Sequence, residues 1–383
     1  MLMTKPILTS IIILNYNLRE YMQGLLDSIR RYTTRGTYEI IVVDNGSQDS
    51  SVEWLQLQQD VRLIANQENV GFPKGCNQGM NIAQGDELLL LNNDVVVTPH
   101  WLDNLRQALY SAPGVGAVGP VTNNCSNMQA VAVPYTNENT QSAMAQMQEF
   151  AAAYNVSDST KWQKWMKLVG FCLLFRREVY AKIGDMDEAY SPGNYEDDDY
   201  CLRIRRAGYE IILCRDTFVH HFGSKTFNIT KDEEKRKYEG YIEKNREYFC
   251  RKWCLDHDWY GKYRTFLPEL AFADEPLRVI EYGVNCTLDL YILGALCHRG
   301  EITGTTSNRY DLFIGSSYPL RYAPDLSSFV DMLDGEYNLI IIPYDFEQVA
   351  DNNVFLSRIE MHLQLGGWLI AVNGDELLKM QRE

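Results

Sequence analysis

Three apolar runs that polar residues end or follow decide the fold of this chain: SIIILN at 10–15, EIIVVD at 39–44, and ELLLL at 87–91 with NND at 92–94 after it. Continuous apolar runs of this length are typical of parallel strands that are buried on both faces of a sheet. Each run is followed by apolar residues at helical spacing, over 19–31, 50–57 and 99–109. This alternation predicts an α/β fold with a mostly parallel sheet, in which ligands bind at the carboxyl ends of the strands.

A second alternating series begins after residues 268–276 and suggests a second domain. In this series we expect strands at 277–282, 301–305, 338–342 and 368–372. We expect helices at 287–297 and 352–363. The charge changes at the same place: residues 265–383 hold 18 acidic and 7 basic residues, while the whole chain of 383 residues has a net charge of -15. At about 150 residues per domain, the length also fits two domains. We therefore predict domains at 1–264 and 265–383, with the boundary near Thr265.

The composition argues against several classes of protein. Hydrophobic residues make up 45% and charged residues 23% of the chain, which is ordinary for a globular protein. The acidic balance argues against nucleic-acid binding, which depends on Lys and Arg. We find no apolar run of the roughly 18 residues that a membrane-spanning helix needs. The nine scattered cysteines suggest free thiols in a reducing compartment. We expect a cytoplasmic protein, either free or peripheral at the inner face of the membrane.

Polar side chains stand directly after two of the buried runs. Asp44 could accept hydrogen bonds from a nucleobase or a ribose, or it could only begin a turn and cap the next helix. Asn92, Asn93 and Asp94 follow the third run. Asp94 could give an oxygen ligand to Mg²⁺ or Mn²⁺, and Asn92 could contact a sugar or a metal-bound water. For these three residues the alternative is an ordinary polar turn.

Three further segments have the composition of binding or catalytic sites. Residues 69–79 (NVGFPKGCNQG) form a glycine-rich loop that enters a helix, where backbone can approach a ligand and the helix N-terminus favours an anion. Residues 196–199 (EDDD) crowd four carboxylates, which raises some of their pKa values, as a catalytic base requires. A charged helix start on the surface is the alternative. The pair His220–His221 offers imidazole ligands for a metal, or is structural.

In order and spacing, these segments resemble the family 2 glycosyltransferases of the GT-A fold, notably the bacterial rhamnosyltransferase-like branch. The matching stretches are SIIILNYN (10–17), IIVVDNGSQDSS (40–51), NVGFPKGCNQG (69–79), LLLLNNDVVV (88–97), VGFCLLFRREVYAKIGDMDEAY (169–190), YEDDDYCLRIRRAGY (195–209) and HHFGSKTF (220–227). Together they lie within a region of about 220 residues out of 383. The resemblance implies a GT-A nucleotide-diphospho-sugar transferase fold for the first domain.

The resemblance also implies roles for individual residues. Asn92–Asn93–Asp94 matches the family's D-x-D motif with Asn as its first residue, so Asp94 is the main acidic metal ligand. His221 completes the metal site, with His220 as the alternate. The base is Asp197, or Asp198 if the register differs by one position. The residues expected to bind the sugar donor are Asn15, Tyr16, Asn17, Asp44, Asn69, Gly71, Phe72, Lys74, Asn77, Asn92 and Asn93.

The implied reaction is an inverting sugar transfer in bacterial cell-surface polysaccharide or glycoconjugate synthesis. Mg²⁺ or Mn²⁺ stabilises the leaving nucleoside diphosphate, and the base deprotonates an acceptor hydroxyl, which attacks the anomeric carbon from the opposite face. The sugar donor is a UDP, dTDP or GDP sugar, and the acceptor is a glycan, a lipid-linked molecule or a protein. Residues 130–166, with Trp162 and Trp165, are expected to help shape the acceptor site. The alternative is a non-catalytic nucleotide-sugar-binding scaffold.

The second domain resembles the class I methyltransferases, whose fold is Rossmann-like. LRVIEYGVNCT (277–287) looks like their first motif, and YNLIIIP (337–343) and LGGWLIAVN (365–373) look like their fourth and fifth strands. Asn285 and Thr287 replace two glycines of the motif, TTSN (305–308) replaces the usual acidic residue, and the pattern stops after a fifth strand. We therefore expect a truncated, non-catalytic domain that docks or forms a homo-oligomer. The alternative is a bifunctional glycosyltransferase and methyltransferase.

Overall fold

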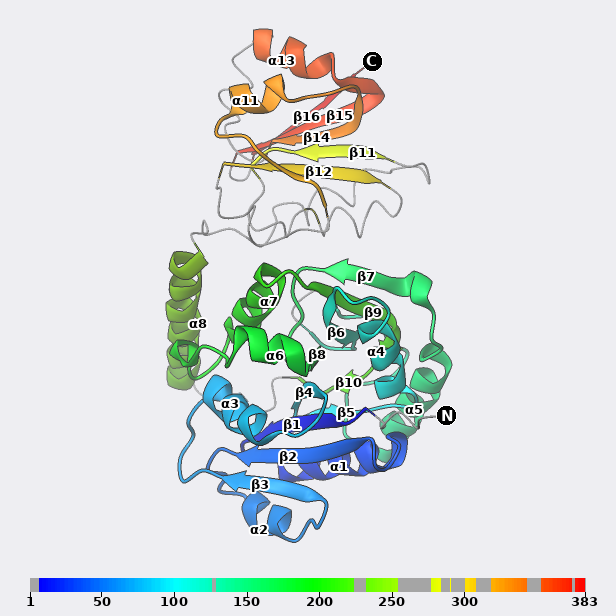
Figure 1. Ribbon diagram of the computed structural model, residues 1–383, viewed down its shortest axis with the longest axis vertical. Coiled ribbons are helices and arrows are strands. Elements are labelled where there is room, and N and C mark those ends of the chain that lie inside the picture. The colour runs from blue at the N-terminus through cyan, green and yellow to red at the C-terminus, as the bar shows by residue number, and fades with distance from the viewer. Residues whose placement is uncertain are drawn as a thin grey trace. The chain divides into compact units, whose positions relative to one another are not determined.

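The computed structural model describes residues 7–125, 129–223, 232–253, 277–283, 290, 300–307, 318–342, 353–373 and 376–382. The chain divides into two compact units, Met1–Phe249 and Cys250–Glu383. Each unit is built on its own sheet with helices packed on it (Figure 1). The domain boundary that we predict near Thr265 lies outside the described residues.

The first unit is built on an eight-stranded mixed sheet. In the order of the sheet its strands are β3 (Val61–Ala65), β2 (Tyr38–Asp44), β1 (Thr9–Asn15), β4 (Glu87–Asn92), β8 (Cys172–Arg176), β6 (Val115–Val121), β9 (Glu210–Phe218) and β7 (Trp162–Trp165). The apolar runs form the parallel half, β3 to β4, as predicted. The other half is less parallel than predicted, because β8 runs antiparallel between β4 and β6, and β7 runs antiparallel to β9.

Eight described α-helices belong to this region of the chain. They are α1 (Arg19–Tyr32), α2 (Ser51–Gln56), α3 (Phe72–Ile82), α4 (Trp101–Leu109), α5 (Gln141–Tyr154), α6 (Arg177–Ile183), α7 (Glu196–Arg206) and α8 (Asp232–Trp253). One core joins Ile11 and Ile13 of β1 to Leu25 of α1 and Leu105 of α4, all fully buried. The opposite face of β1 lies against α3. Alternate side chains of one strand thus pack on different helices.

Two glycines bring α3 close to the sheet. A Cβ atom at Gly75 would lie 2.2 Å from Leu14 Cδ1, and one at Gly79 would lie 2.4 Å from Ile12 Cγ2. Neither distance is possible for a real Cβ contact, so a larger residue at either position would push the helix away from β1. We predicted that the glycines of this segment let backbone approach a ligand. These two instead serve the packing of helix on strand.

A short ribbon lies beside the carboxyl end of β4. β5 (Val95–Val96) pairs antiparallel with β10 (His220–His221), so that His221 lies opposite Val95. The backbone N–H of Phe222 also donates to the carbonyl oxygen of Asp94 at 3.0 Å. The ribbon therefore brings the predicted histidine pair next to the predicted metal-binding carboxylate, although they are more than 120 residues apart in the chain.

The second unit contains a six-stranded sheet. In sheet order its strands are β13 (Leu320–Tyr322), β12 (Glu301–Thr306), β11 (Arg278–Glu281), β14 (Tyr337–Ile342), β15 (Leu363–Asn373) and β16 (Glu376–Gln381). The first five are parallel, in the strand order of a doubly wound sheet. Helices α11 (Leu326–Asp331) and α13 (Asn353–Glu360) belong to this unit. The predicted stop after a fifth strand is wrong, because β16 adds a sixth strand antiparallel to β15.

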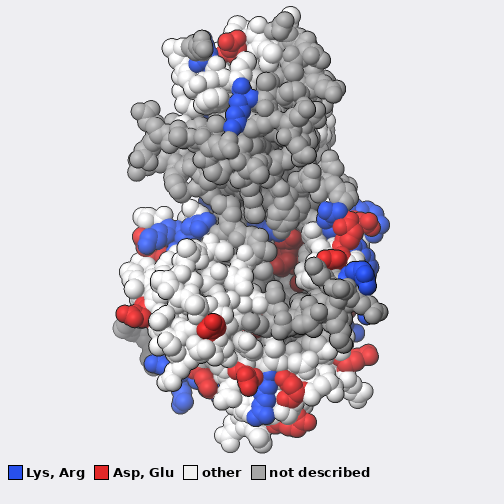
Figure 2. All heavy atoms as spheres, turned by 180° about the vertical axis from the view of Figure 1, so that it is seen from behind, with Lys and Arg blue, Asp and Glu red and all other residues white. Residues whose placement is uncertain are grey.

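The predicted fold class, an α/β protein with a second and smaller α/β unit, is confirmed. The motif residues Asn285, Thr287 and Asn308 lie outside the described residues, as does the predicted helix 287–297 except for Leu290. Among the described helices, none has both the length and the apolar character needed to cross a membrane. Six of the cysteines lie in the described residues, and five of these six are buried. Basic and acidic side chains are interspersed on the described surface seen in Figure 2.

Candidate functional site

The carboxyl ends of β1, β2 and β4 are joined by hydrogen bonds between side chains. Asn15 Nδ2 donates to Asp44 Oδ2 at 2.7 Å, and Asn93 Nδ2 donates to Asn15 Oδ1 at 2.9 Å. All three side chains are buried. Parallel strands end at one edge of a sheet, and this chain of bonds ties that edge together. The amides of Asn15 and Asn93, which we predicted to bind the sugar donor, hold the edge in shape.

The Asp44 carboxylate is saturated by protein groups. Its Oδ1 accepts from the backbone N–H groups of Gly46 at 3.1 Å and Ser47 at 2.9 Å, and its Oδ2 accepts from Ser47 Oγ at 2.7 Å as well as from Asn15. The residue has no solvent-exposed surface. This geometry favours the turn-forming alternative for Asp44. A nucleobase or ribose would have to displace one of these bonds to reach the carboxylate.

Asp94 lies in a different environment, opposite His221. The distance from His221 Nε2 to Asp94 Oδ1 is 3.2 Å, yet Nε2 is buried and makes no hydrogen bond to any of the described residues. His221 Nδ1 lies 2.9 Å from the carbonyl oxygen of Asn124, which can only accept a proton. This contact places the imidazole proton on Nδ1, so Nε2, which lies 3.2 Å from Asp94 Oδ1, carries a lone pair.

Three residues outside the predicted set hold His221 in place. Asn123 Nδ2 donates to the His221 carbonyl at 3.1 Å, and the His221 N–H donates to Asn123 Oδ1 at 2.9 Å. The Phe171 ring stacks on the imidazole, with 5.1 Å between ring centroids and 14° between planes. We missed Asn123 and Asn124, although they follow the apolar strand β6 much as Asn93 and Asp94 follow β4.

His220 is directed away from Asp94, because successive residues of a strand face opposite sides. Its Nδ1 lies 3.0 Å from the Tyr135 hydroxyl, and its ring packs edge-on against Phe222. Burial, with His221 nearby, lowers the pKa of His220 to about 4. Of the two histidines, His221 is therefore the one placed to act with Asp94.

The Asp94–His221 pair fits a divalent cation. A carboxylate oxygen and an imidazole lone pair repel each other at 3.2 Å unless a cation or a proton lies with them. Imidazole and carboxylate together suit Mn²⁺, and carboxylate suits Mg²⁺. Within the described residues, no group of three or more His, Cys, Asp or Glu comes together to hold a metal. Such an ion would keep most of its coordination positions for substrate oxygens and water.

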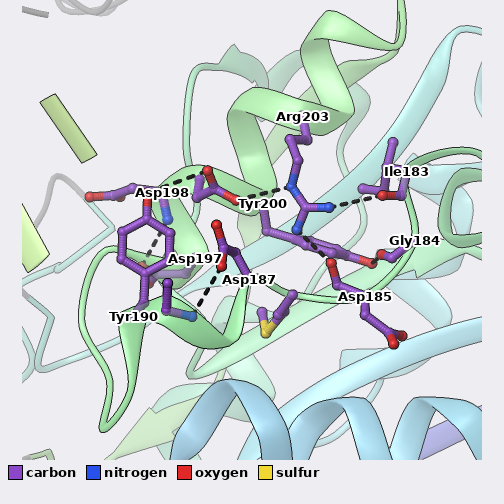
Figure 3. A network of polar contacts seen from close by, with 12 residues as sticks. Ile183, Gly184, Asp185, Asp187, Tyr190, Asp197, Asp198, Tyr200 and Arg203 are labelled. Atoms are coloured by element: carbon purple, nitrogen blue, oxygen red, sulfur yellow. Dashed lines mark hydrogen bonds and ion pairs between the residues drawn. The ribbon is translucent and has the colours of Figure 1, made fainter. Parts of the chain in front are cut away.

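The four acidic residues 196–199, which we call the acid run, form the first turn of α7, and their carboxylates have different partners. Asp199 Oδ2 accepts from Arg203 Nε at 3.0 Å, and Arg203 also donates to the carbonyl oxygens of Ile183 and Asp185 (Figure 3). Asp198 Oδ1 lies 2.6 Å from Lys167 Nζ, and both side chains are buried. Two of the four carboxylates are therefore paired with cations.

Asp197 is the member of the run with the greatest access to solvent, since the other three are buried. Its Oδ2 accepts from the Gly170 N–H at 3.0 Å and its Oδ1 from the Asp198 N–H at 2.9 Å. Burial raises the pKa of Asp198 to about 6, against the opposing effect of Lys167, and raises the pKa of Glu196 well above its ordinary value. The predicted rise of pKa values in the run is confirmed, with burial as its first cause and neighbouring carboxylates as another.

The glycine-rich loop packs on the segment before α7. The Asn77 amide donates to the Met186 carbonyl at 2.9 Å and accepts from the Met186 N–H at 2.8 Å, so this predicted sugar-donor residue has a structural role. Gly71 has φ 90°, and a Cβ there would lie 2.7 Å from Ser191 Oγ. Asn69 Oδ1 accepts from the Gly71 N–H. Lys74 is exposed and Phe72 partly exposed, so both remain accessible.

The other predicted residues lie in two places. Tyr16, Asn17 and Asn92 are partly exposed at the carboxyl ends of β1, β2 and β4, which we call the strand edge. The Asn17 N–H donates there to Ser47 Oγ at 2.7 Å. Trp162 and Trp165 belong to β7, at the sheet edge. Trp162 Nε1 donates to Asp216 at 2.8 Å, and Trp165 is only 3% exposed. The buried Trp165 offers no accessible ring to an acceptor.

Two consecutive residues connect the Asp94–His221 pair to the acid run. Gly170 donates its N–H to Asp197, and the next residue, Phe171, stacks on His221. The Phe171 carbonyl also accepts from the Asn92 N–H at 3.0 Å. A candidate metal site and a candidate base thus lie on either side of one short segment before β8. An acidic metal ligand, an imidazole and a nearby accessible carboxylate suit the transfer of a group from a diphosphate to a hydroxyl.

Comparison with known proteins agrees with this chemistry. Residues 10–184 match the family described as glycosyl transferase family 2. The chain is 26% identical over 66% of its length to the protein y4gI of Sinorhizobium fredii, and 27% identical over 53% of its length to the O-antigen biosynthesis protein RfbC of Myxococcus xanthus. It spans only 28% and 16% of the lengths of these two relatives.

A shorter relative is covered more fully. The N-acetylglucosaminyl-diphospho-decaprenol L-rhamnosyltransferase of Mycobacterium tuberculosis is 25% identical over 56% of this chain and 76% of its own length. Among solved structures, the mannosyltransferase PcManGT of Pyrobaculum calidifontis, in complex with GDP-Man and Mn²⁺, is 19% identical, with a TM-score of 0.45 over 65% of each chain. Over residues 10–184 the first unit is thus similar to the family 2 glycosyltransferases, and the relatives that it resembles include a rhamnosyltransferase.

Proposed function

We propose that this domain transfers a sugar, with inversion, from a nucleoside diphosphate donor to an acceptor hydroxyl, and that the transfer depends on a divalent cation. The observation that carries the proposal is the short segment Gly170–Phe171, which contacts Asp197 on one side and His221 on the other. The family match over residues 10–184 supports the reaction class, although it ends before α7 and β10.

Asp94 and His221 would hold the cation. When bound, Mg²⁺ or Mn²⁺ supplies positive charge that stabilises the leaving diphosphate. The protein prepares this site by fixing the His221 ring: Asn124 sets its tautomer, Asn123 fixes its backbone and Phe171 limits its rotation. A ligand pair held in this way needs little reorganisation when the substrate arrives.

Asp197 would act as the general base. Its carboxylate accepts two backbone N–H bonds that fix its orientation, and it keeps access to solvent and hence to an acceptor hydroxyl. Asp198 is less suited, because it is buried and paired with Lys167. Asp199 is held by Arg203. We therefore assign the proton transfer to Asp197, the first Asp of the run.

The sugar donor would lie along the strand edge. Tyr16, Asn17 and Asn92 are partly exposed there, and Phe72 and Lys74 remain accessible at the start of α3. The O-antigen and decaprenol-linked names of two relatives favour an acceptor in cell-surface polysaccharide or cell-wall synthesis. A UDP, dTDP or GDP sugar is the expected donor class.

The test is metal-dependent hydrolysis of a panel of UDP, dTDP and GDP sugars by the full chain, without acceptor, followed by transfer assays with the active donor. We expect one donor class to be hydrolysed with Mn²⁺ or Mg²⁺ and not with EDTA. Asp197→Asn should keep donor binding in calorimetry and lose transfer by a factor of about 10²–10⁴. Failure of every donor to bind in the presence of metal would overturn the proposal, and full activity of Asp197→Asn would move the base elsewhere.

A further inference from the structure

Helix α8 contacts the loop that leads directly into the acid run. Asn245 of α8 has no exposed surface, and its Nδ2 lies within hydrogen-bond distance of three carbonyl oxygens, those of Tyr190 (2.5 Å), Gly193 (2.9 Å) and Asn194 (3.3 Å). A single amide group thus serves three carbonyls of one loop. Buried carbonyls need such donors, so Asn245 has a direct part in the shape of residues 190–195.

This loop needs support because its backbone is strained. Asn194 and Tyr195 have φ angles of 77° and 72°, in the left-handed region that residues other than glycine rarely adopt. Two such residues in succession persist only when the surroundings leave no better arrangement. The carbonyl that Asn245 contacts at the end of the loop belongs to Asn194, the first of the two.

Other α8 residues hold the same loop. The Tyr238 hydroxyl donates to Asn194 Oδ1 at 3.3 Å, and the Phe249 ring lies 5.5 Å from that of Tyr195. The Tyr248 hydroxyl donates to Asp187 at 2.9 Å, and its ring packs on Tyr190. Contacts from three turns of α8 therefore meet residues on both sides of Gly193.

The loop in turn sets the start of α7. Tyr195 is the residue before the helix, and its carbonyl accepts from the Asp199 N–H at 2.9 Å. If Asn194 and Tyr195 relaxed to ordinary φ angles, the direction of the first turn would change. The Asp197 carboxylate would then leave the Gly170 N–H, to which it is bonded at 3.0 Å.

We propose that Asn245 is a positioning residue for the transfer reaction: it holds the left-handed pair Asn194–Tyr195 and thereby directs Asp197 towards Gly170. This inference rests on the proposed function in one respect, the role of Asp197 as base. It assigns part of the catalytic arrangement to α8, which lies beyond the segment 10–184 that matches the family.

The test compares Asn245→Ala with Lys244→Ala, an exposed neighbour on the same helix, in the full-length protein. We expect Asn245→Ala to lower kcat about 10–100-fold and to leave KM and the calorimetric Kd for the sugar donor within about twofold, because the donor contacts lie at the strand edge. Lys244→Ala should match the wild type. Equal losses in both variants, or an unchanged kcat in Asn245→Ala, would overturn the inference.

Two further variants separate positioning from a general loss of structure. Asn194→Gly accepts a positive φ without strain, so in the Asn245→Ala background it should restore kcat by about tenfold. Tyr238→Phe removes only the hydroxyl contact to Asn194 and should lower kcat less than Asn245→Ala does. If Asn245→Ala does not fold, the fall in kcat of Tyr238→Phe relative to the wild type tests the inference. A drop in kcat that Asn194→Gly does not relieve would assign Asn245 to overall stability.

Hydrogen exchange gives a readout that does not depend on activity. Asn245→Ala should speed amide exchange in residues 190–199 about tenfold or more and leave the strand edge at Asn15 and Asp44 unchanged. If the wild type hydrolyses no sugar donor but this pattern appears, the proposed function fails and the positioning of α7 by Asn245 stands. If the wild type is active and Asn245→Ala leaves the exchange rates unchanged, the positioning role of Asn245 fails and the proposed function stands.

Discussion

The strand edge and the acid run both contain carboxylates of the first unit, but different kinds of groups surround these carboxylates. At the strand edge, Asp44 receives four hydrogen bonds from amide, hydroxyl and backbone groups. In the acid run, Asp198 is paired with a cation, and Glu196 Oε2 has no hydrogen-bond partner within the part of the chain that the structure describes. The edge is held by dipoles that are near in sequence or on neighbouring strands, whereas the run depends on burial and on charge from another segment.

The same contrast separates the two carboxylates at the edge. Asp44 and Asp94 both follow apolar strands, yet Asp44 is surrounded by donors while Asp94 faces an imidazole lone pair. Position at a strand end therefore does not decide what a carboxylate can do. The number of N–H and O–H donors around it decides whether it keeps a turn in place or remains available to a cation.

The largest effect should come from removing the cation of the acid run. Lys167→Met leaves Asp198 buried without its partner, which costs about 3–5 kcal/mol when the carboxylate is ionised. Burial raises the pKa of Asp198 to about 6 in the wild type, against the opposing effect of Lys167, and removal of Lys167 raises it further. The loss in unfolding free energy should therefore be large at pH 8 and small at pH 5, where Asp198 is mostly neutral in both proteins, in denaturant titrations at both pH values.

The double variant Lys167→Met/Asp198→Asn is the matched control for that experiment. It removes both charges, so its stability should show little of the pH dependence of the single variant. An equal loss at pH 5 and pH 8 in Lys167→Met would mean that the pair contributes packing rather than charge. In that case the contrast between the two regions would no longer hold.

The next effect should appear at the edge, in activity. Asp94→Asn replaces a charged oxygen ligand by a neutral one, and we expect metal-dependent hydrolysis of the sugar donor to fall about 10²–10³-fold with little change in stability. Calorimetry with Mn²⁺ and the nucleoside diphosphate should show weaker metal binding. Normal metal dependence in Asp94→Asn would place the cation away from the Asp94–His221 pair.

Asp44→Ala should have the reverse profile. It removes the acceptor of four hydrogen bonds and leaves buried N–H groups of the turn unpaired, which should cost about 2–3 kcal/mol in thermal or denaturant unfolding. Metal binding at Asp94 should change little in protein that remains folded. If Asp44→Ala is as stable as the wild type but no longer binds nucleotide, Asp44 serves the nucleotide rather than the turn.

The smallest effect concerns the second unit, where we expect none. Its first-motif sequence lacks two glycines and its second strand lacks a following acidic residue, so S-adenosylmethionine should not bind. Calorimetric titration of the full chain with S-adenosylmethionine should show no heat of binding at micromolar concentrations. Micromolar binding would revive the bifunctional alternative for this chain.

Much of the fold could be predicted because apolar runs and helical spacing are local signals. They located β1, β2 and β4 to within one residue, but they carry no direction, so the antiparallel course of β8 was not predicted. β7 is only four residues long, WQKW, and half-exposed, so its pattern was too weak to detect. Strand order and direction depend on pairing between distant segments, which periodicity does not record.

The site could be predicted in part for the same reason. Asp94 and His221 carry their chemistry in their own side chains, and the structure brings them to 3.2 Å. Asn77 looked equivalent to a ligand-binding amide, but its partner, Met186, lies 109 residues away. Lys167 and Asn245 could not be found at all, because their importance arises from partners in other segments.

The double contact between Asn123 and His221 has an evolutionary consequence. The Asn123 side chain bonds both the N–H and the C=O of His221, as a neighbouring strand would, so β10 gains a second partner beside β5 without any further strand. Asp and Leu, which are similar in size, could not make both bonds, since Asp lacks the donor and Leu lacks both groups. Because both groups belong to the backbone of residue 221, the two bonds do not depend on the imidazole, and among descendants of a common ancestor Asn123 should persist even where another residue replaces the histidine.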